Sequence, residues 1–288
     1  EEVDMVYMGQ VLSAGVGQNP ARQASIYAGL PNTTTNTTIN QVCGSGLASI
    51  ALAYNSIRCG DGNIIIAGGQ ESMSNAPHYI KLRKGEKVNE DKIKDTMIID
   101  GLWDVYNEYH MGTTAENVAK KFNIKRQDQD KFALNSQEKA IKAIKEKKFI
   151  NEIVPVEINN NINFEQDEHP RENTSIEKLS ELKTVFKKDG TVTPGNSSGI
   201  NDGAAAVCLM TFENVKKKKI KPLAKIVSWA QCGVDPSIMG TGPIPASKLA
   251  LKKADWDIKE LELIESNEAF AAQSIAVNKE LGWETNNL

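Results

Sequence analysis

The chain has 288 residues, of which 40% are hydrophobic and 25% charged, and its formal net charge is -3 at pH 7. This composition is typical of a folded globular protein, and so small a net charge gives no reason to expect a nucleic-acid or membrane partner. No apolar run is long enough to cross a bilayer, and no stretch has the pattern of a signal peptide. The four cysteines lie far apart without a Cys-x-x-Cys pair, which is typical of free thiols in a reducing compartment. We therefore expect a cytoplasmic protein, with a mitochondrial location as the alternative.

The first part of the sequence alternates between patterns typical of strands and patterns typical of helices. The expected elements are, in chain order, a strand at 6–12, a helix that begins with Pro20, a threonine-rich strand at 33–42, a helix at 47–57 and a buried strand at 64–69. Strand, helix and strand in this order predict a right-handed crossover in a sheet covered on both faces.

After Gln70 the pattern changes. Residues 70–199 are rich in charge and asparagine and predict a loop-dominated excursion that includes a lysine-rich helix at 127–148. The later elements are expected to be strands at 202–210 and 223–231, a helix at 245–253, a strand at 260–266 and a helix at 267–281. The last strand and helix echo the arrangement around Cys43, which suggests two related halves.

Cys43 stands between the threonine-rich strand and the glycine-flanked start of the next helix. A thiol at a helix N-terminus is close to the positive end of the helix dipole and to unpaired N–H groups, and both stabilise a thiolate. Gly44 and Gly46 let a substrate approach the backbone, and the N–H groups of such a turn can bind an oxyanion. Cys43 is therefore a candidate nucleophile. The alternative is a buried structural cysteine.

Six segments carry a family resemblance. In chain order they are NQVCGSGLASIAL, AGGQESMSNAPH, YHMGTTAEN, TPGNSSGINDGAAAV, GTGPIPA and NEAFAAQ. They resemble the successive signature blocks of the thiolase family, closest to its short-chain acetyl-CoA acetyltransferases, and the resemblance spans essentially the whole chain. It implies an α/β fold of five layers (α-β-α-β-α), built from two related halves with mixed sheets and an inserted loop domain.

The resemblance also implies a division of the chain by role. Residues 1–72 and 201–221 match the N-terminal half with the nucleophilic cysteine, and residues 73–200 match a loop domain for CoA binding and oligomerisation. Residues 222–288 match the start of the C-terminal half. The family's tetramerisation loop falls at 78–95, so a homo-oligomer, either a tetramer or a dimer, is expected.

The reaction implied by the resemblance is the reversible Claisen condensation of two acetyl-CoA molecules to acetoacetyl-CoA and CoA. Cys43 matches the nucleophile that carries the acetyl group as a thioester, and its N–H would contribute to an oxyanion hole. Asn267 matches the asparagine that holds a water in a second oxyanion hole, and its alternative role is a helix N-cap. The chemistry agrees, because condensation produces an enolate and a tetrahedral oxyanion that each need placed donors. CoA and acetyl-CoA are substrates, and no permanently bound cofactor is expected.

Further residues match family positions that contact CoA. Ser198 matches a serine at the pantetheine, and His110 and Met111 match the lining of the acyl and pantetheine tunnel. Arg171 matches an arginine beside the nucleotide, where a planar cation can pair with phosphate or stack on adenine. The alternatives are a turn serine, a structural histidine and a solvated loop charge. The matched apolar pocket positions, each by default a core residue, are Leu102, Phe186, Met239 and Phe270.

Two expectations limit this interpretation. The run KKKKIK at 216–221 looks like a phosphate or nucleic-acid patch, but the family places a solvated helix end there, and we expect the same here. The family's Gly-His-Pro block, whose histidine activates the nucleophile, and its Cys-x-Gly-Gly-Gly block, whose cysteine is the acid–base, have no match in this sequence. The family's first strand and helix are also unmatched.

Two hypotheses follow. In the first, the chain is a truncated acetyl-CoA C-acetyltransferase that as given lacks full activity, because a nucleophile without its base loses orders of magnitude in rate. In the second, the chain is complete and is a catalytically inactive thiolase-like protein that binds CoA or a partner.

Overall fold

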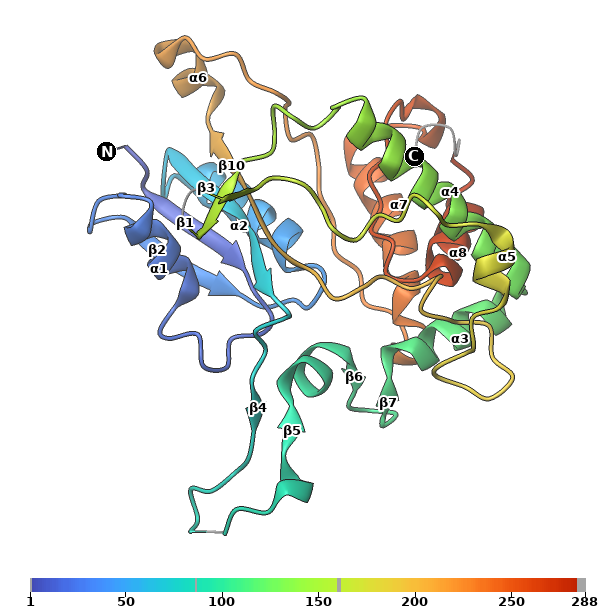
Figure 1. Ribbon diagram of the computed structural model, residues 1–288. Helices are drawn as coiled ribbons and strands as arrows, with labels where there is room; N and C mark the ends of the chain where they lie inside the picture. Colours follow the sequence, from blue (N-terminus) through green and yellow to red (C-terminus); the bar gives the residue numbers. More distant parts are fainter. Residues whose placement is uncertain (1, 86, 160–161, 284–288) are drawn as a thin grey trace. The chain divides into compact units, whose positions relative to one another are not determined.

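The computed structural model describes residues 2–85, 87–159 and 162–283. Residue 86 of the segment matched to the tetramerisation loop, residues 160–161 of the loop domain and residues 284–288 of the C-terminal half lie outside the described residues. The chain forms two compact units (Figure 1): Glu1–Trp103 with Ile200–Trp229, and Asp104–Gly199 with Ala230–Leu288. In the described residues no helix is long and apolar enough to span a membrane.

The first unit is built around a four-stranded sheet with the strand order β10-β3-β1-β2. Its strands are β1 (Met5–Gly9), β2 (Thr35–Ile39), β3 (Ile64–Ser72) and β10 (Asp202–Met210). β1 pairs in parallel with both β2 and β3, whereas β10 runs antiparallel to β3. The strand expected at 202–210 is confirmed with the same bounds, and the expected mixed α/β sheet is confirmed.

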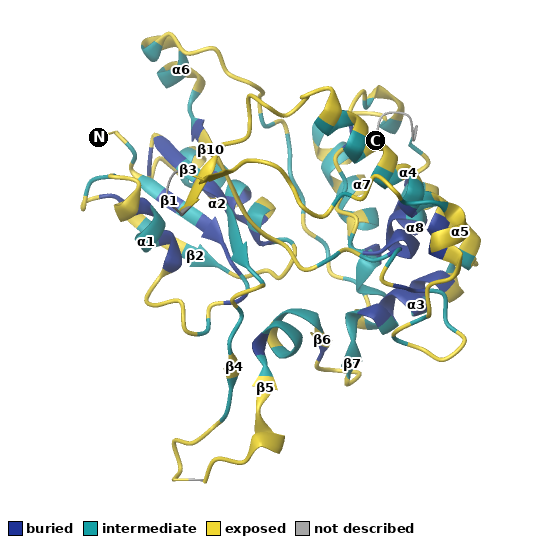
Figure 2. Ribbon diagram, in the orientation of Figure 1, coloured by how far each residue is buried: buried dark blue, intermediate teal, exposed yellow. Residues whose placement is uncertain are grey.

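Two helices cover opposite faces of this sheet. They are α1 (Pro20–Tyr27) and α2 (Ser45–Cys59). Val6 and Met8 of β1 form a buried cluster with Ala21 of α1, whereas Tyr7 packs against the cluster that contains Ala53 of α2. Successive side chains of a strand point to opposite faces, so the alternation along β1 requires one helix on each side. The result is a sheet whose inner strands are buried from both sides (Figure 2).

The strand order fixes where a ligand is expected on this sheet. The chain passes from β1 through α1 to β2 on one side, and then returns through α2 past β1 to β3 on the other side. The order therefore reverses between β1 and β3. In open α/β sheets, ligands bind beyond the carboxyl ends of the strands at such a switch point.

The remaining elements of the first unit are short. They are β4 (His78–Tyr79), β5 (Lys94–Asp95), a 3₁₀ turn (Glu90–Lys92), a π-helix (Met97–Leu102), and α6 (Phe212–Lys218). β4 pairs antiparallel with β5. β6 (Trp103–Asp104) lies where the chain passes from the first unit to the second.

The second unit is mainly helical. It contains β7 (Tyr109–His110), α3 (Met111–Lys121), α4 (Arg126–Lys145), β8 (Val156–Asn159), β9 (Ile162–Phe164), α5 (Ile176–Ser180), α7 (Pro243–Ala254), α8 (Ala271–Leu281), and 3₁₀ segments at Pro236–Thr241 and Ile258–Glu260. Val118 and Ala119 of α3 form a buried cluster with Ala272 and Ala276 of α8. These small side chains allow the two helices to approach closely. The sequence pattern predicts a loop-dominated excursion here, and the helix α3 is a correction to it.

Two expected strands are wrong. Residues 223–231 and 260–266 form no strand in the described part of the chain, and Leu223 and Leu263 are 104% and 76% exposed. Alternating apolar residues favour an extended backbone, but a strand exists only where a partner completes the hydrogen-bond ladder. The helices expected at 245–253 and 267–281 are confirmed as α7 and α8, although α8 begins only at Ala271.

Candidate active site

A pocket of about 490 Å³ opens at the carboxyl edge of the first unit's sheet, and Cys43 lies in its wall. Its walls come from the ends of β1 and β3, the turn after β2 and the start of β10. The lining residues are Gly9, Gln10, Val11, Leu12, Val42, Cys43, Ser45, Gly46, Gly69, Gln70, Glu71, Met73, Met97, Gly101, Leu102, Gly203, Ala204 and Ala205. The pocket thus occupies the switch point that the strand order defines.

Glycines bring the start of α2 against the strand ends beside this pocket. Gly9 pairs with Gly69 in the register of β1 and β3. A Cβ atom on Gly9 would lie 2.5 Å from the backbone carbon of Ser45 and 2.7 Å from the nitrogen of Gly46. A Cβ atom on Gly69 would lie 3.5 Å from the Cα atom of Gly46. Only a glycine at position 9 leaves room for the helix, so the N-terminus of α2 rests directly on the sheet.

Cys43 is presented by a tight turn. Val42 has a φ of 48°, which is a left-handed conformation that a β-branched residue rarely adopts. The hydroxyl of Ser45 donates to the carbonyl of Val42 (2.6 Å) and accepts from the N–H of Gln41 (2.8 Å), which closes the turn around the cysteine. The side chain of Asn40 also accepts from the N–H of Val42 (2.9 Å). Strained residues of this kind are held by their surroundings and are frequent at functional sites.

The surroundings of Cys43 act on the pKa of its thiol in opposing directions. The residue is exposed, but the pocket wall removes water from the sulfur, and this burial raises the pKa of the thiol. A backbone hydrogen bond opposes the rise, and the carboxylate of Glu71 adds to it. Burial and Glu71 thus oppose the stabilisation of the thiolate that we expect from the helix N-terminus. A nucleophilic role for Cys43 requires a base to take its proton.

Polar side chains near the cysteine were missed in the sequence. Gln10 is 7% exposed and accepts a hydrogen bond from Gln70 (2.9 Å), and Glu71 accepts from the N–H groups of Val11 and Leu12 (2.9 and 3.0 Å). Gln10 follows β1 directly, and Gln70 and Glu71 are among the last residues of β3, and this position at the carboxyl edge is the signal that would have identified them. Leu102, which the sequence singled out, ends the π-helix and lines the same pocket.

The second unit brings several of the other candidate residues together. His110 stacks on Phe186 with ring centroids 4.7 Å apart, and Phe186 meets Phe270 edge to face at 6.3 Å. Met111 and Phe186 pack on the buried cluster that contains Phe270. Gly112 makes the stack possible, because a Cβ atom there would lie 2.1 Å from the ring of Phe186.

His110 has a structural role that the alternative interpretation anticipated. Its Nδ1 accepts the N–H of Gly112 (3.0 Å) and so caps the start of α3. Burial lowers the pKa of the imidazole, so the ring is neutral at physiological pH. Since Nδ1 accepts, the neutral ring carries its proton on Nε2 and presents a fixed donor there.

Ser198 and the segment before α8 lie side by side. Ser198 donates from its N–H and its hydroxyl to the carbonyl of Ala269 (3.0 and 3.2 Å). Asn267 is exposed, two residues before Ala269. The alternative of a helix N-cap at Asn267 is wrong, because α8 begins at Ala271 and Phe270 occupies the N-cap position.

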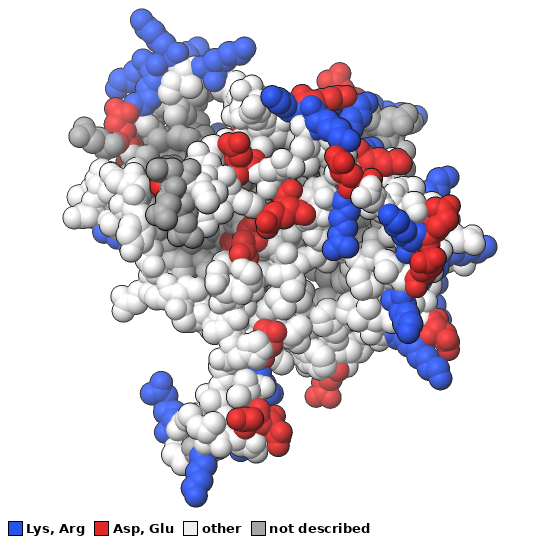
Figure 3. Space-filling model, viewed as in Figure 1, with Lys and Arg blue, Asp and Glu red and all other residues white. Residues whose placement is uncertain are grey.

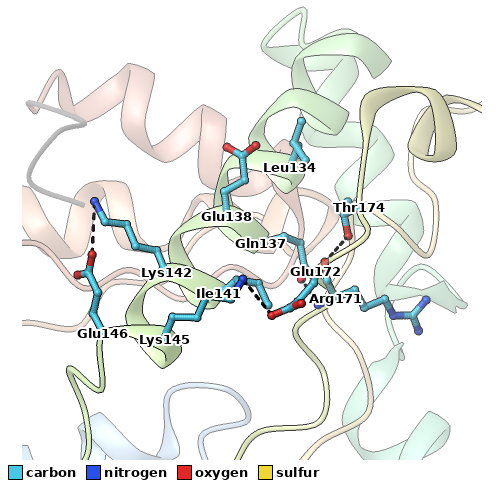
Figure 4. Close-up of a pocket in the computed structure, with 10 residues that line it drawn as sticks. All are labelled: Leu134, Gln137, Glu138, Ile141, Lys142, Lys145, Glu146, Arg171, Glu172 and Thr174. Atoms are coloured by element: carbon cyan, nitrogen blue, oxygen red, sulfur yellow. Dashed lines mark hydrogen bonds and ion pairs between the residues drawn. The ribbon is translucent and has the colours of Figure 1, made fainter.

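Arg171 lies at a separate pocket of about 360 Å³ beside α4 (Figure 4). Its N–H donates to Gln137 (2.7 Å), and its guanidinium points away from the lysines of α4 in this view. Lys145 pairs with Glu172 (3.1 Å) and Lys142 with Glu146 (3.9 Å). Both lysines that line this pocket have an acidic partner, whereas Arg171 is exposed and stays the candidate for a phosphate.

Met239 and the lysine run at 216–221 line neither of the two pockets. Met239 lies half-buried in the 3₁₀ segment that packs against α3 and α8, where its backbone carbonyl accepts from Gly242 (3.0 Å). The lysine run is an exposed helix end at α6 (Figure 3), and Lys218 pairs with Glu2. No group of three or more His, Cys, Asp or Glu side chains in the described residues could hold a metal ion.

The arrangement of strands, glycines and the cysteine turn agrees with the comparison to known families. The family described as "Thiolase, N-terminal domain" matches residues 1–213, and "Thiolase, C-terminal domain" matches residues 220–288. The chain belongs to the thiolase family. The expected resemblance and fold are thereby confirmed.

Two similar relatives have the same printed name. "Acetyl-CoA acetyltransferase" of Rhizobium meliloti is 55% identical over 286 residues, and that of Allochromatium vinosum is 53% identical over 289 residues. These alignments cover 98% and 99% of this thiolase and 73% of each relative. The crystal structure of the acetyl-CoA acetyltransferase from Bacillus anthracis superposes with a TM-score of 0.95 at 43% identity, covering 99% of this chain and 73% of that one.

Proposed function

We propose that this thiolase catalyses the reversible Claisen condensation of two acetyl-CoA molecules to acetoacetyl-CoA and CoA. The observation that carries the proposal is the presentation of Cys43 on a strained turn in the pocket at the sheet's switch point. Relatives at 52 to 55% identity, all named acetyl-CoA acetyltransferase, give the same reaction.

In the first half of the reaction, the thiolate of Cys43 attacks the carbonyl carbon of acetyl-CoA. A tetrahedral oxyanion forms, the bond to the CoA sulfur breaks, and CoA leaves as its thiol after taking the proton that Cys43 lost. In the second half, another acetyl-CoA loses a proton from its α-carbon, and the resulting enolate forms a carbon–carbon bond to the acetyl group on Cys43. The bond between the acetyl carbonyl carbon and the Cys43 sulfur then breaks, acetoacetyl-CoA leaves, and Cys43 gains a proton that balances the one lost from the α-carbon.

The side chains of the first unit support the cysteine's share of this chemistry. N–H groups at the start of α2 form the positive end of the helix dipole, where an oxyanion is stabilised. The raised pKa of Cys43 means that attack needs a proton acceptor. No histidine of this sequence lies in a Gly-His-Pro block, so the proton transfer is assigned to none of its three histidines.

We assign the CoA contacts to side chains of the second unit. The proposed contacts are Ser198 for the pantetheine, His110, Met111, Phe186, Met239 and Phe270 for the acyl and pantetheine path, and Arg171 for the nucleotide, while Leu102 of the first unit lines the cysteine's pocket. Asn267 is proposed to hold the water that stabilises the enolate, which its exposure permits. In this assignment residues 1–72 and 201–221 carry the nucleophile, residues 73–200 bind CoA, and residues 222–288 begin the half that holds Asn267.

The assembly and the location are also proposed. A homo-oligomer, tetramer or dimer, is supported by the paired strands β4 and β5, which carry the segment at 78–95. Light scattering of the purified chain tests it, and a monomer at micromolar concentration would contradict it. A cytoplasmic location is supported by four free cysteines.

The decisive experiment for the function is acetylation of the chain. The protein is incubated with acetyl-CoA, and intact mass spectrometry is expected to show one added acetyl group. Cys43→Ala is expected to lose the adduct, and Cys59→Ala, which alters another exposed cysteine at the end of α2, is the matched control that keeps it. An adduct that survives in Cys43→Ala would overturn the assignment. No adduct on the folded chain, with CoA still bound, would favour an inactive CoA-binding protein.

A further inference from the structure

Two distant segments of the second unit meet in a single β-bridge. Ser197 and Phe270 form an isolated antiparallel bridge. On one side of it, Ser198 donates to the carbonyl of Ala269 (3.0 Å). On the other side, the N–H of Ala271 donates to the carbonyl of Asn196 (2.9 Å). The segment that carries Phe270 is thus held at the same point as the loop that carries Ser198.

The bridge also caps α8. The first N–H groups of a helix have no partner within it, and α8 has no side chain that accepts from them. The carbonyl of Asn196 accepts the N–H of Ala271 in place of a side-chain cap. Movement of residue 196 would therefore disturb both the start of α8 and the residues just before it.

The side chain of Asn196 is fixed by a buried carboxylate. Asn196 and Asp130 are each 3% exposed, and the amide nitrogen of Asn196 donates to Oδ1 of Asp130 (2.9 Å) and to the carbonyl of Thr191 (3.1 Å). The amide oxygen of Asn196 accepts from the N–H of Thr193 (2.8 Å). The side chain thus makes three hydrogen bonds inside the protein and has one orientation.

Asp130 is itself held from the other side. Oδ2 accepts from Nε of Arg126 (2.7 Å), and the same guanidinium donates to the carbonyls of Leu179 and Leu182. A buried carboxylate with both oxygens occupied is costly to disrupt, because the loss of one partner leaves a charge or a donor unpaired. The second unit already has an apolar core, and a buried carboxylate is costly to desolvate. The carboxylate of Asp130 therefore points to a role in holding neighbouring residues in position.

We propose that Asp130 and Asn196 are positioning residues that hold Ser198 and the segment 267–270 in one fixed arrangement for CoA. The inference rests on the proposed function, which assigns Ser198, Phe270 and Asn267 to the substrate. Asp130 and Asn196 touch no substrate in this account. They act through the backbone of residues 196–198 and through its bridge to Phe270.

The test compares Asp130→Asn with Asp128→Asn in the full chain. Asp128 lies on the same helix and makes a capping bond to the N–H of Lys125 (3.0 Å), so its substitution changes the same charge without touching residue 196. Three quantities are measured: amide hydrogen exchange at Ala271, the imidazole proton resonances of His110, and the Kd for CoA by titration calorimetry.

Asp130→Asn is expected to speed exchange at Ala271 and to raise the Kd for CoA, each by about tenfold, whereas Asp128→Asn leaves both near their original values. The His110 resonances are expected to shift only in Asp130→Asn, since His110 stacks on Phe186 and Phe186 contacts Phe270. If Asp130→Asn does not fold, Asn196→Ala, which leaves the Arg126–Asp130 pair in place, carries the same test.

The outcomes separate this proposal from the proposed function. Faster exchange with an unchanged Kd would reduce Asp130 to a purely structural residue and overturn the proposal, as would equal effects of the two substitutions. If the unsubstituted chain does not bind CoA, the proposed function fails. In that case the His110 resonances of Asp130→Asn decide whether Asp130 positions the Phe270 segment. Resonances unchanged from the unsubstituted chain would overturn the proposal.

Discussion

Gly9→Ala is expected to separate the nucleophile's helix from the sheet that supports it. The new Cβ atom would lie 2.5 Å from the carbon and 2.6 Å from the Cβ atom of Ser45, and 2.7 Å from the nitrogen of Gly46. Two of these three atoms belong to the backbone, so no rotamer change can relieve the contact. The start of α2 must retreat by about 0.9 Å to reach an ordinary contact of about 3.4 Å.

The cost of this retreat follows from two opposing effects. Overpacking a tight contact costs about 1 to 3 kcal/mol, whereas replacing glycine by alanine stabilises by about 0.4 to 1 kcal/mol through the unfolded chain. The free energy of unfolding of the first unit is therefore expected to fall by about 1 to 2 kcal/mol. Because Ser45 holds Val42 and Gln41 by hydrogen bonds, the cysteine turn moves with the helix. A displacement near 1 Å reduces the rate of a positioned reaction on the order of 100-fold.

Urea denaturation and the rate of Cys43 acetylation by acetyl-CoA measure the two effects. For the urea midpoint alone, the matched control is Gly46→Ala, whose Cβ atom meets nothing within 4 Å and which is expected to keep or raise stability. Its acetylation rate is not a control, because Gly46 lines the cysteine's pocket. A Gly9→Ala protein with the original urea midpoint and acetylation rate would refute the close packing of α2 on β1.

Three further outcomes are expected. Glu71→Gln removes a negative charge that disfavours the thiolate, so the pKa of Cys43 is expected to fall. The pH midpoint of Cys43 alkylation by iodoacetamide then moves lower, and an unchanged midpoint would contradict the influence of Glu71. Gly112→Ala displaces the ring of Phe186, and about a tenfold weaker binding of CoA is expected by calorimetry, whereas unaltered affinity would exclude this stack from the site. Burial lowers the pKa of His110, so proton NMR is expected to give a pKa below the ordinary histidine value in the folded chain and the ordinary value in urea. Equal pKa values in the two states would contradict the effect of burial.

The sequence predicted the elements that depend on local pattern. The strand at 202–210 and the helix after Cys43 follow from apolar spacing and from glycine at the helix end, and the structure has both. The expected strand at 260–266 failed because a strand depends on a partner that pattern alone does not reveal. α3 was not predicted because most of the residues that it buries are small or polar, so the segment lacks the spacing of large apolar side chains that marks a helix.

The site was predictable in its residue types and not in its electrostatics. Cys43 was identified from its place between a strand and a helix, where the helix N-terminus is a local feature that the sequence pattern reveals. Desolvation by the pocket wall and the charge of Glu71 depend on side chains that only the fold brings near the sulfur. The N-cap alternative for Asn267 failed for a similar reason, since a distant backbone carbonyl at Asn196 supplies the cap.

The left-handed Val42 sets thermal robustness against reactivity in this protein. A β-branched residue at a φ of 48° costs on the order of 1 to 3 kcal/mol, and glycine would adopt the same conformation freely. A selection for heat resistance alone would therefore favour Val42→Gly. The same change would enlarge the range of conformations open to the neighbouring cysteine. Selecting variants of this protein for stability alone would therefore lower the rate of the reaction at Cys43.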